Sequence, residues 1–347
     1  MTFYCGLGII ILILVFLADF SRKNQKLLLF LIFMILFIAS AVRYNIGIDY
    51  YGHEQLYWAI KSGNFFVTEP LYLLLNVICI KLGFGFQVIV AIMSFITLYP
   101  IYLISKKEKI SYLFLLYYFF MYLVSFCLIR QYAAISIVLY GIYIYTKNRK
   151  KTYFLFLCSI CIHISMLIFI ICFFLGKLIK VNKHSVFVLS IIFYLIGIKT
   201  DLLLKIISSV AFFSKYGNYL KVGNSNNSVV QLGSGFGILL RLFISFGGLY
   251  IINYNCQNKT IKNIYNFLFL FMIIADSLSI RIQIFLRLRL SFSACYLMPF
   301  MYFPTQVRNK NLLSLSSVLY VFCLCGYILT FPSTATMWGN LPYQIFF

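Results

Sequence analysis

The chain has 347 residues, of which 63% are hydrophobic and only 10% are charged, and its mean hydropathy is +0.96. This composition excludes an ordinary water-soluble protein, because so much apolar surface cannot all be buried in a soluble core. The formal net charge of +22 would suggest nucleic acid as the partner of a soluble chain. Here short basic loops between apolar segments explain most of it, so we expect no nucleic-acid partner.

Apolar segments long enough to be candidate membrane crossings recur along the whole chain. In chain order they are residues 3–20, 27–42, 86–104, 111–128, 131–146, 185–198, 236–252, 264–280, 290–304 and 311–330. Basic residues follow the first segment instead of preceding it, so we interpret it as a retained helix and not a signal peptide. The pattern predicts an all-α, polytopic membrane helix bundle with about ten crossings, built as a single integral membrane domain over residues 1–347.

The basic loops set the expected orientation of these segments. They are SRKNQK, SKKEK, KNRKK, KLIKVNK, NYNCQNKTIKN and QVRNKN, and the positive-inside rule places all of them in the cytoplasm. That placement works only if residues 70–82 and 153–176 form re-entrant or half-depth helices, the second broken at His163. Both termini then lie outside, together with the long outer loops 43–69 and 199–235.

The first outer loop concentrates ionisable side chains. It holds three of the seven acidic residues, Asp49, Glu54 and Glu69, beside Arg43 and His53. One interpretation is an interfacial turn with an aromatic belt, formed by Tyr44, Tyr50, Tyr51, Tyr57 and Trp58. The other is a carbohydrate-facing site, because tyrosine rings and carboxylates offer stacking faces and hydrogen-bond acceptors to a sugar. We expect His53 and Glu54 to be solvated neighbours in either case.

Arginines mark the expected outer ends of later segments. Arg130 interrupts the apolar stretch 113–146, and Arg281, Arg287 and Arg289 lie together in SIRIQIFLRLRLSF. Snorkelling to lipid headgroups would explain each of them. An arginine at a membrane boundary also suits phosphate, because its planar fork binds two oxygens at once. A lipid diphosphate is the natural anion of that kind in a membrane.

His163 lies in CSICIHISMLI, shortly after Cys158 and Cys161. The three side chains lack the fourth ligand and the spacing of a zinc site, so we expect no metal and no cofactor. His163 is either a packing residue or a catalytic one. The ten cysteines lie mostly inside apolar segments and give no disulfide framework.

Taken in order, these pieces resemble the EpsG/Wzy-like family of polysaccharide repeat-unit polymerases. The matching residues are Arg43 with Gly47, Asp49 and Tyr57; EPLY at 69–72; Arg130-Gln131 followed by Ala133-Ala134; His163 and Ser165; Arg287 or Arg289 before Pro299; and LPY at 341–343. The resemblance implies a GT-C-like glycosyltransferase on the outer face of the bacterial cytoplasmic (inner) membrane. Its substrates would be a donor and an acceptor linked to undecaprenyl diphosphate, among membrane lipids, with a chain-length regulator as a further partner.

The resemblance also implies roles for individual residues. Arg130, Gln131 and one or more of Arg281, Arg287 and Arg289 would hold the donor, while Arg43 would hold Asp49 or a second phosphate, and Glu69 would contact the substrate. The base is either Asp49 or His163, and we favour Asp49 because it lies at the outer boundary. Ser291-Phe292 stands where the family usually has Tyr-Phe, so the arginine that corresponds to the family residue stays open.

Other classes of membrane protein fit the same composition. A flippase or other transporter of lipid-linked oligosaccharides would be equally apolar and basic, but would be expected to carry charges deep in several helices. A ligase that transfers finished polysaccharide, or an acyltransferase, would also act at a membrane. An acyltransferase usually contains more histidine than the three found here.

Overall fold

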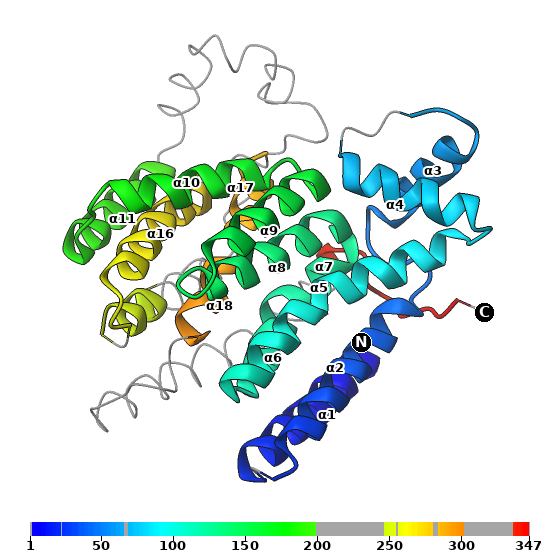
Figure 1. Ribbon diagram of the computed structural model, residues 1–347, viewed down its shortest axis with the longest axis horizontal. Coiled ribbons are helices and arrows are strands. Elements are labelled where there is room, and N and C mark those ends of the chain that lie inside the picture. The colour runs from blue at the N-terminus through cyan, green and yellow to red at the C-terminus, as the bar shows by residue number, and fades with distance from the viewer. Residues whose placement is uncertain are drawn as a thin grey trace. The chain divides into compact units, whose positions relative to one another are not determined.

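The computed structural model describes residues 2–21, 23–65, 69–198, 246–254, 256–279, 284–301 and 336–346. Within these ranges the secondary structure is helical apart from one isolated bridge between Arg43 and Ile345. The expected all-α, polytopic membrane architecture is confirmed (Figure 1). The chain divides into two compact units, one of residues 1–167 with 300–347 and one of residues 168–299. That both belong to one membrane domain stays a prediction.

The first unit contains most of the helices that concern the site. They are α1 (Thr2–Phe20), α2 (Gln25–Ala41), α3 (Tyr50–Lys61), α4 (Pro70–Lys81), α5 (Phe86–Glu108), α6 (Tyr112–Tyr117), α7 (Leu123–Cys127), α8 (Ile129–Ile144) and α9 (Arg149–Ile162). A π-helical turn, Tyr118–Tyr122, joins α6 to α7. The second unit holds most of α10 (Met166–Leu178) and of α18 (Ala294–Met301). It also holds α11 (Lys183–Ile198), α16 (Lys259–Ser279), α17 (Ile284–Ser291) and a helical stretch at 246–254.

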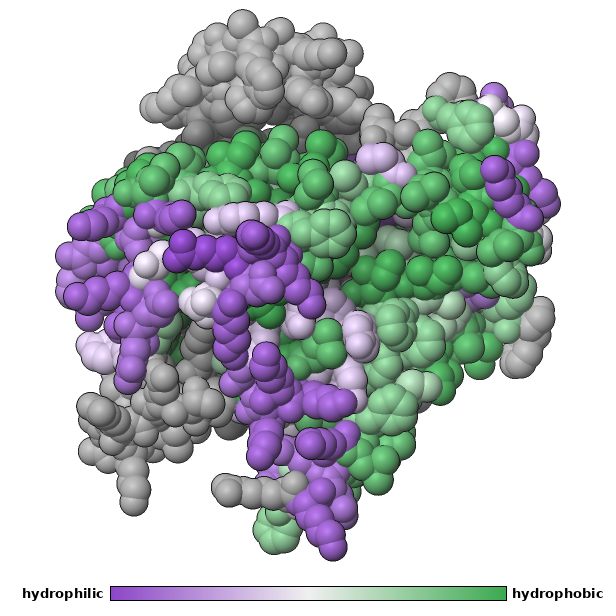
Figure 2. All heavy atoms as spheres, viewed as in Figure 1, coloured by the Kyte–Doolittle hydropathy of each residue, from purple (hydrophilic) through white to green (hydrophobic). Residues whose placement is uncertain are grey.

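Three of the described helices, α1, α5 and α16, are long and apolar enough to cross a bilayer alone. At 1.5 Å per residue, the 23 residues of α5 span about 35 Å, against about 30 Å of hydrocarbon. Large apolar side chains remain exposed on several of the described helices, as with Phe16 of α1 and Leu195 of α11. In Figure 2 hydrophobic side chains cover α10 and much of the region of α3 to α5, and hydrophilic ones gather at the ends of helices, where the basic loops join them.

Two expected irregularities of the helices can be compared with the structure. The break at His163 is confirmed: α9 ends at Ile162, His163 has an extended backbone (φ −155, ψ 115), and α10 begins at Met166. Helix α4 has 12 residues, about 18 Å, and is too short for a full crossing. The re-entrant path of both segments stays a prediction.

Two other segments differ in detail from what the sequence suggested, although the outer position of loop 43–69 stays a prediction. The outer loop 43–69 contains a regular helix, α3, because Tyr50, His53, Tyr57 and Ile60 recur at helical spacing and are buried on one face. The expected crossing 290–304 is not one helix, since α17 and α18 are separated by a turn at 292–293. The hydroxyl of Ser291 donates to the carbonyl of Arg287, a back-bond that favours ending a helix. The expected crossing 311–330 and the outer loop 199–235 lie outside the described residues.

Residues 336–346, here called the C-terminal segment, pack against the chain that follows α2. Backbone N–H groups of Tyr44, Gly47 and Ile48 donate to carbonyls of Gln344, Gly339 and Trp338, and Phe346 donates to Val42. The Tyr343 hydroxyl donates to the Ala39 carbonyl at 2.6 Å. The exit of α2 is therefore fixed by backbone pairing with a remote part of the sequence.

Candidate functional site

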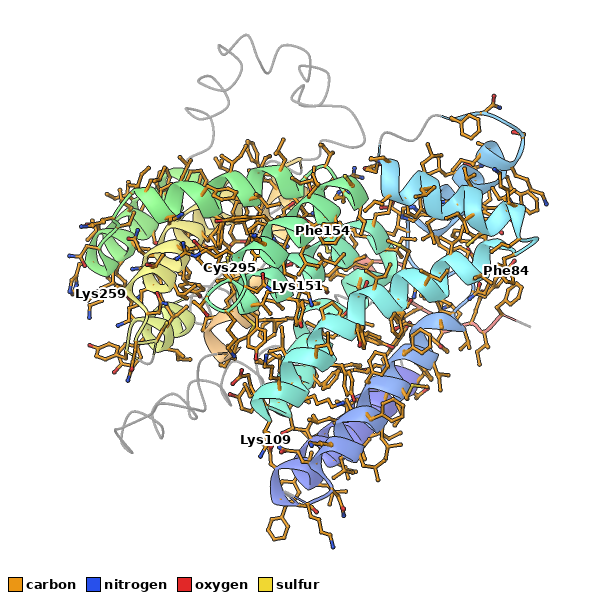
Figure 3. The ribbon with its side chains drawn as sticks, in the orientation of Figure 1. Phe84, Lys109, Lys151, Phe154, Lys259 and Cys295 are labelled. Atoms are coloured by element: carbon orange, nitrogen blue, oxygen red, sulfur yellow. The ribbon has the colours of Figure 1, made fainter. Side chains whose placement is uncertain are left out.

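Basic loops share one end of the first unit. Lys109 and Phe84 lie at opposite ends of α5 (Figure 3). At the Lys109 end, the Gln25 side chain donates to the Lys109 carbonyl at 3.1 Å, and Lys147 lies 3.8 Å from the Glu108 carboxylate. The loops SRKNQK, SKKEK and KNRKK therefore meet there, as the positive-inside argument expected.

The opposite end of the unit carries several of the expected site residues, among them Arg130 and His163. The Tyr57 hydroxyl of α3 donates to the Phe84 carbonyl at 2.6 Å, which places α3 at this end. Helix α8 ends beside Glu108, where Tyr143 bonds to it, so α8 begins at the Phe84 end with Arg130 in its first turn. Helix α9 starts from the basic loop 147–151 and runs toward this end, where it stops at His163.

Glu69 joins Arg130 to His163. Its Oε2 accepts from Arg130 Nη1 at 2.8 Å, and its Oε1 lies 3.2 Å from Nδ1 of His163. Glu69 occupies the N-cap position of α4 before Pro70, but its carboxylate makes no capping bond. The side chains of Arg130 and His163 are 24% and 22% exposed, against 8% for Glu69. The cluster thus has a buried carboxylate and two accessible partners.

The rings of Tyr72 and His53 lie beside this cluster. The guanidinium of Arg130 lies 5.1 Å from the centroid of the Tyr72 ring, and the His53 ring lies 6.3 Å from the same ring. His53 is only 6% exposed, so the expectation that it is solvated was wrong: the buried face of α3 carries it inward. Burial, followed by the nearby charge of Arg130, lowers the pKa of His53 to about 3. His53 is therefore neutral at physiological pH.

Arg43 and Asp49 do not pair as expected. Arg43 is 1% exposed, its Nη1 donates to the Ser40 carbonyl and to Ser94 Oγ, and its guanidinium lies 4.5 Å from the centroid of the Phe126 ring. Among the ion pairs of the described residues, none joins Arg43 to Asp49, whose side chain interacts with the Cys127 thiol. Burial lowers the pKa of Arg43 to about 10, which leaves it charged at neutral pH. Arg43 is thus enclosed by protein instead of facing a ligand.

The late arginines belong to the second unit. Arg289 Nη1 lies 3.2 Å from Asp276 Oδ1, and the Tyr194 hydroxyl donates to the other oxygen of the same carboxylate. Asp276 is 2% exposed, so Arg289 neutralises a buried charge. Arg287 is exposed, because two positions along α17 separate it from Arg289 and turn it to another face. Arg281 lies outside the described residues.

Two buried polar residues, Gln131 and Asp276, differ in how far the sequence indicated them. Gln131 is buried and follows Arg130 on α8, so its side chain faces the interior. Asp276 was missed by sequence reasoning, although an acid inside the apolar stretch 264–280 is an unusual and readable signal. Its partner Tyr194 has no such signal in the sequence.

Comparison with known protein families decides the assignment. The model of the EpsG family matches residues 26–345. The chain belongs to the EpsG family. This confirms the resemblance drawn from motif order, and the EpsG family is a Wzy-like polysaccharide polymerase family. No curated protein and no solved structure matches the chain.

Membership of the EpsG family assigns a general role to this membrane protein. It supports a polysaccharide polymerase type of activity, with lipid-linked sugars as the general class of substrate. The family match covers both units and all the clusters described above, because it extends from α2 to the C-terminal segment.

Proposed function

We propose that this EpsG-family protein polymerises lipid-linked oligosaccharide repeat units. The growing glycan passes from undecaprenyl diphosphate to the non-reducing end of another undecaprenyl-diphosphate-linked unit, on the outer face of the cytoplasmic membrane. The observation that carries this proposal is the cluster of Glu69, Arg130 and His163. It combines an accessible cation with an accessible imidazole, at the end of the first unit opposite the basic loops.

The position of the cluster supports the outer face. Positive loops remain in the cytoplasm, so the end of α5 that lies near Lys109 faces inward and the Phe84 end faces outward. Lys61 and Lys81 also lie toward the Phe84 end, but each is a single exposed lysine at the end of a short helix. The assembled loops of the other end outweigh them.

The chemistry of transfer requires a cation and a base. The leaving diphosphate carries negative charge that a positioned guanidinium stabilises, and Arg130 supplies it. We assign Arg287 to a lipid-borne phosphate because its side chain is exposed on α17, whereas Arg289 neutralises the buried Asp276 carboxylate. For the base we now favour His163 over Asp49, because an imidazole beside a carboxylate is a common arrangement for accepting a proton.

A complementation experiment tests the function. In a deletion strain that carries plasmid copies, Arg130→Ala should leave only single repeat units on a surface-polysaccharide gel, whereas wild type gives a ladder of long chains. Lys81→Ala is the matched control, because it removes an exposed cation near the same end and should keep the ladder. Long chains from Arg130→Ala at wild-type protein level would refute the proposal.

The same strains separate the two bases and the other protein classes. His163→Gln should abolish the ladder, and Asp49→Asn should retain it; the reverse pattern would assign the base to Asp49. A deletion that leaves no surface glycan at all would indicate a flippase. A deletion that leaves polymer length unchanged would indicate a ligase.

A further inference from the structure

We propose that Glu69 is a positioning residue for the transfer reaction and not a sugar ligand. Its carboxylate sets which nitrogen of His163 carries the proton, and it holds Arg130 until the donor diphosphate replaces it. This inference rests on the proposed function, in which His163 is the base and Arg130 binds the leaving group. It also replaces the expectation that Glu69 contacts the substrate directly.

Burial argues against a direct contact with sugar. The Glu69 side chain is 8% exposed, whereas both of its partners are more than twice as exposed. A buried carboxylate is stable only when hydrogen bonds and opposite charge compensate its desolvation. Arg130, at 2.8 Å, provides the charge, and His163 lies within hydrogen-bond distance of the other oxygen. The Glu69 carboxylate thus faces the side chains of Arg130 and His163 and not the solvent-accessible side of the cluster.

The hydrogen-bond geometry fixes the tautomer of His163. An arginine at this distance favours the ionised form of Glu69, and an ionised carboxylate only accepts hydrogen bonds. The Nδ1 of His163, 3.2 Å from Oε1, must therefore carry the hydrogen. Nε2 is then the nitrogen with the free lone pair, and only that nitrogen can take a proton from an acceptor hydroxyl.

With this tautomer, His163 can act as the base of glycosyl transfer through Nε2. The acceptor hydroxyl loses its proton to Nε2 of His163, and the oxygen forms a new bond to the anomeric carbon of the donor. The bond between that carbon and the diphosphate oxygen breaks, and its electron pair leaves with the diphosphate. The resulting imidazolium lies beside the Glu69 carboxylate, which stabilises its charge.

Because Glu69 contacts both Arg130 and His163, binding of the donor to Arg130 also affects the base, His163. The diphosphate and the Glu69 carboxylate compete for the same guanidinium, because each is an anion suited to the arginine fork. Once the diphosphate holds Arg130, the Glu69 carboxylate keeps its contact with His163. Removing the negative charge of Glu69 should therefore ease donor binding while it slows transfer.

Kinetics distinguish this role from that of a sugar ligand. Lipid-linked single units extracted from the deletion strain serve as substrate for the purified full-length protein. We expect Glu69→Gln to lower kcat about 10- to 100-fold without raising the KM for these units. Glu69→Asp, which keeps the charge, should recover part of kcat. An increased KM with unchanged kcat would overturn the proposal and make Glu69 a substrate ligand.

A spectroscopic measurement tests the tautomer without any substrate. The chain contains three histidines, His53, His163 and His184, so selective ¹⁵N labelling gives three sets of ring signals, assigned by single substitutions. In the wild-type protein His163 should show a protonated Nδ1 and a bare Nε2, and Glu69→Gln should lose this preference. An unchanged unfolding midpoint and unchanged His184 signals in the variant would show that the fold is intact.

These measurements distinguish a failure of the positioning role of Glu69 from a failure of the proposed function. If the His163 signals are the same in wild type and in folded Glu69→Gln, the positioning role is refuted whatever Arg130→Ala does to the ladder. If the signals change as expected while Arg130→Ala still makes long chains, the proposed function fails but the contact between Glu69 and His163 stands.

Discussion

Replacing Gly47 by alanine should destabilise the protein more than the same change at two other glycines of the outer loop. Gly47 has φ +99, and a Cβ there would lie 2.8 Å from the Phe126 carbonyl oxygen and 3.0 Å from Cys127 Cα. A left-handed backbone costs a non-glycine residue about 1–2 kcal/mol. Overpacking against a rigid backbone adds about 1–3 kcal/mol. We therefore expect Gly47→Ala to lower the free energy of unfolding by about 2–5 kcal/mol.

Two matched variants separate these contributions. Gly63 has φ +90 with open space around it, so Gly63→Ala should cost only the backbone strain, about 1–2 kcal/mol. Gly52 lies inside α3 with nothing within 4 Å, so Gly52→Ala should stabilise by up to about 1 kcal/mol. Unfolding midpoints of the purified proteins in detergent should fall in the order Gly52→Ala, wild type, Gly63→Ala, Gly47→Ala. Equal midpoints for Gly47→Ala and Gly63→Ala would refute the close approach of Gly47 to α7.

The remaining predictions concern other parts of the two units. The pKa of His53 falls from 6.5 to about 3 on folding, so below pH 6.5 the unfolded chain binds a proton that the folded chain does not bind. At pH 5 this lowers the free energy of unfolding by about 2 kcal/mol. The unfolding midpoint of His53→Asn should therefore change less between about pH 7.5 and 5 than that of wild type. Arg289→Gln should cost about 3 kcal/mol because it leaves the buried Asp276 carboxylate without its cation, and adding Asp276→Asn should restore most of the midpoint; no recovery in the double variant would contradict the pairing. Tyr343→Phe should cost about 1 kcal/mol by removing one hydroxyl bond to Ala39, measured in the same unfolding assay, and an unchanged midpoint would argue against this contact.

Local patterns in the sequence were sufficient for the fold class and for part of the site. Long apolar runs predicted a membrane helix bundle, and the histidine within an apolar segment predicted the break that separates α9 from α10. Arg130 and His163 were both singled out because ionisable groups are costly at these positions. Glu69 was included as well, as a substrate-binding residue, and only the fold shows that its oxygens face Arg130 and His163.

Partners that are distant in the sequence could not be predicted. Arg43 is satisfied by Ser94, 51 residues away, and no pattern near either residue indicates the other. The same is true of Tyr194 and Asp276, which are 82 residues apart. The helix α3 was missed because polar residues at its exposed positions resemble a loop, while its buried face is narrow and partly polar. Periodicity reports which face is buried, but not what covers it.

The pairing of the C-terminal segment with the exit of α2 sets an order of events during biosynthesis. Ala39 enters the membrane early, yet its partner Tyr343 follows 304 residues later. At about 5–20 residues per second, the ribosome needs roughly 15–60 s to supply that partner. Until then the backbone amides of Tyr44, Gly47 and Ile48 lack their final acceptors. A nascent chain therefore cannot complete its outer loop, and translation itself delays the appearance of a finished polymerase in the membrane.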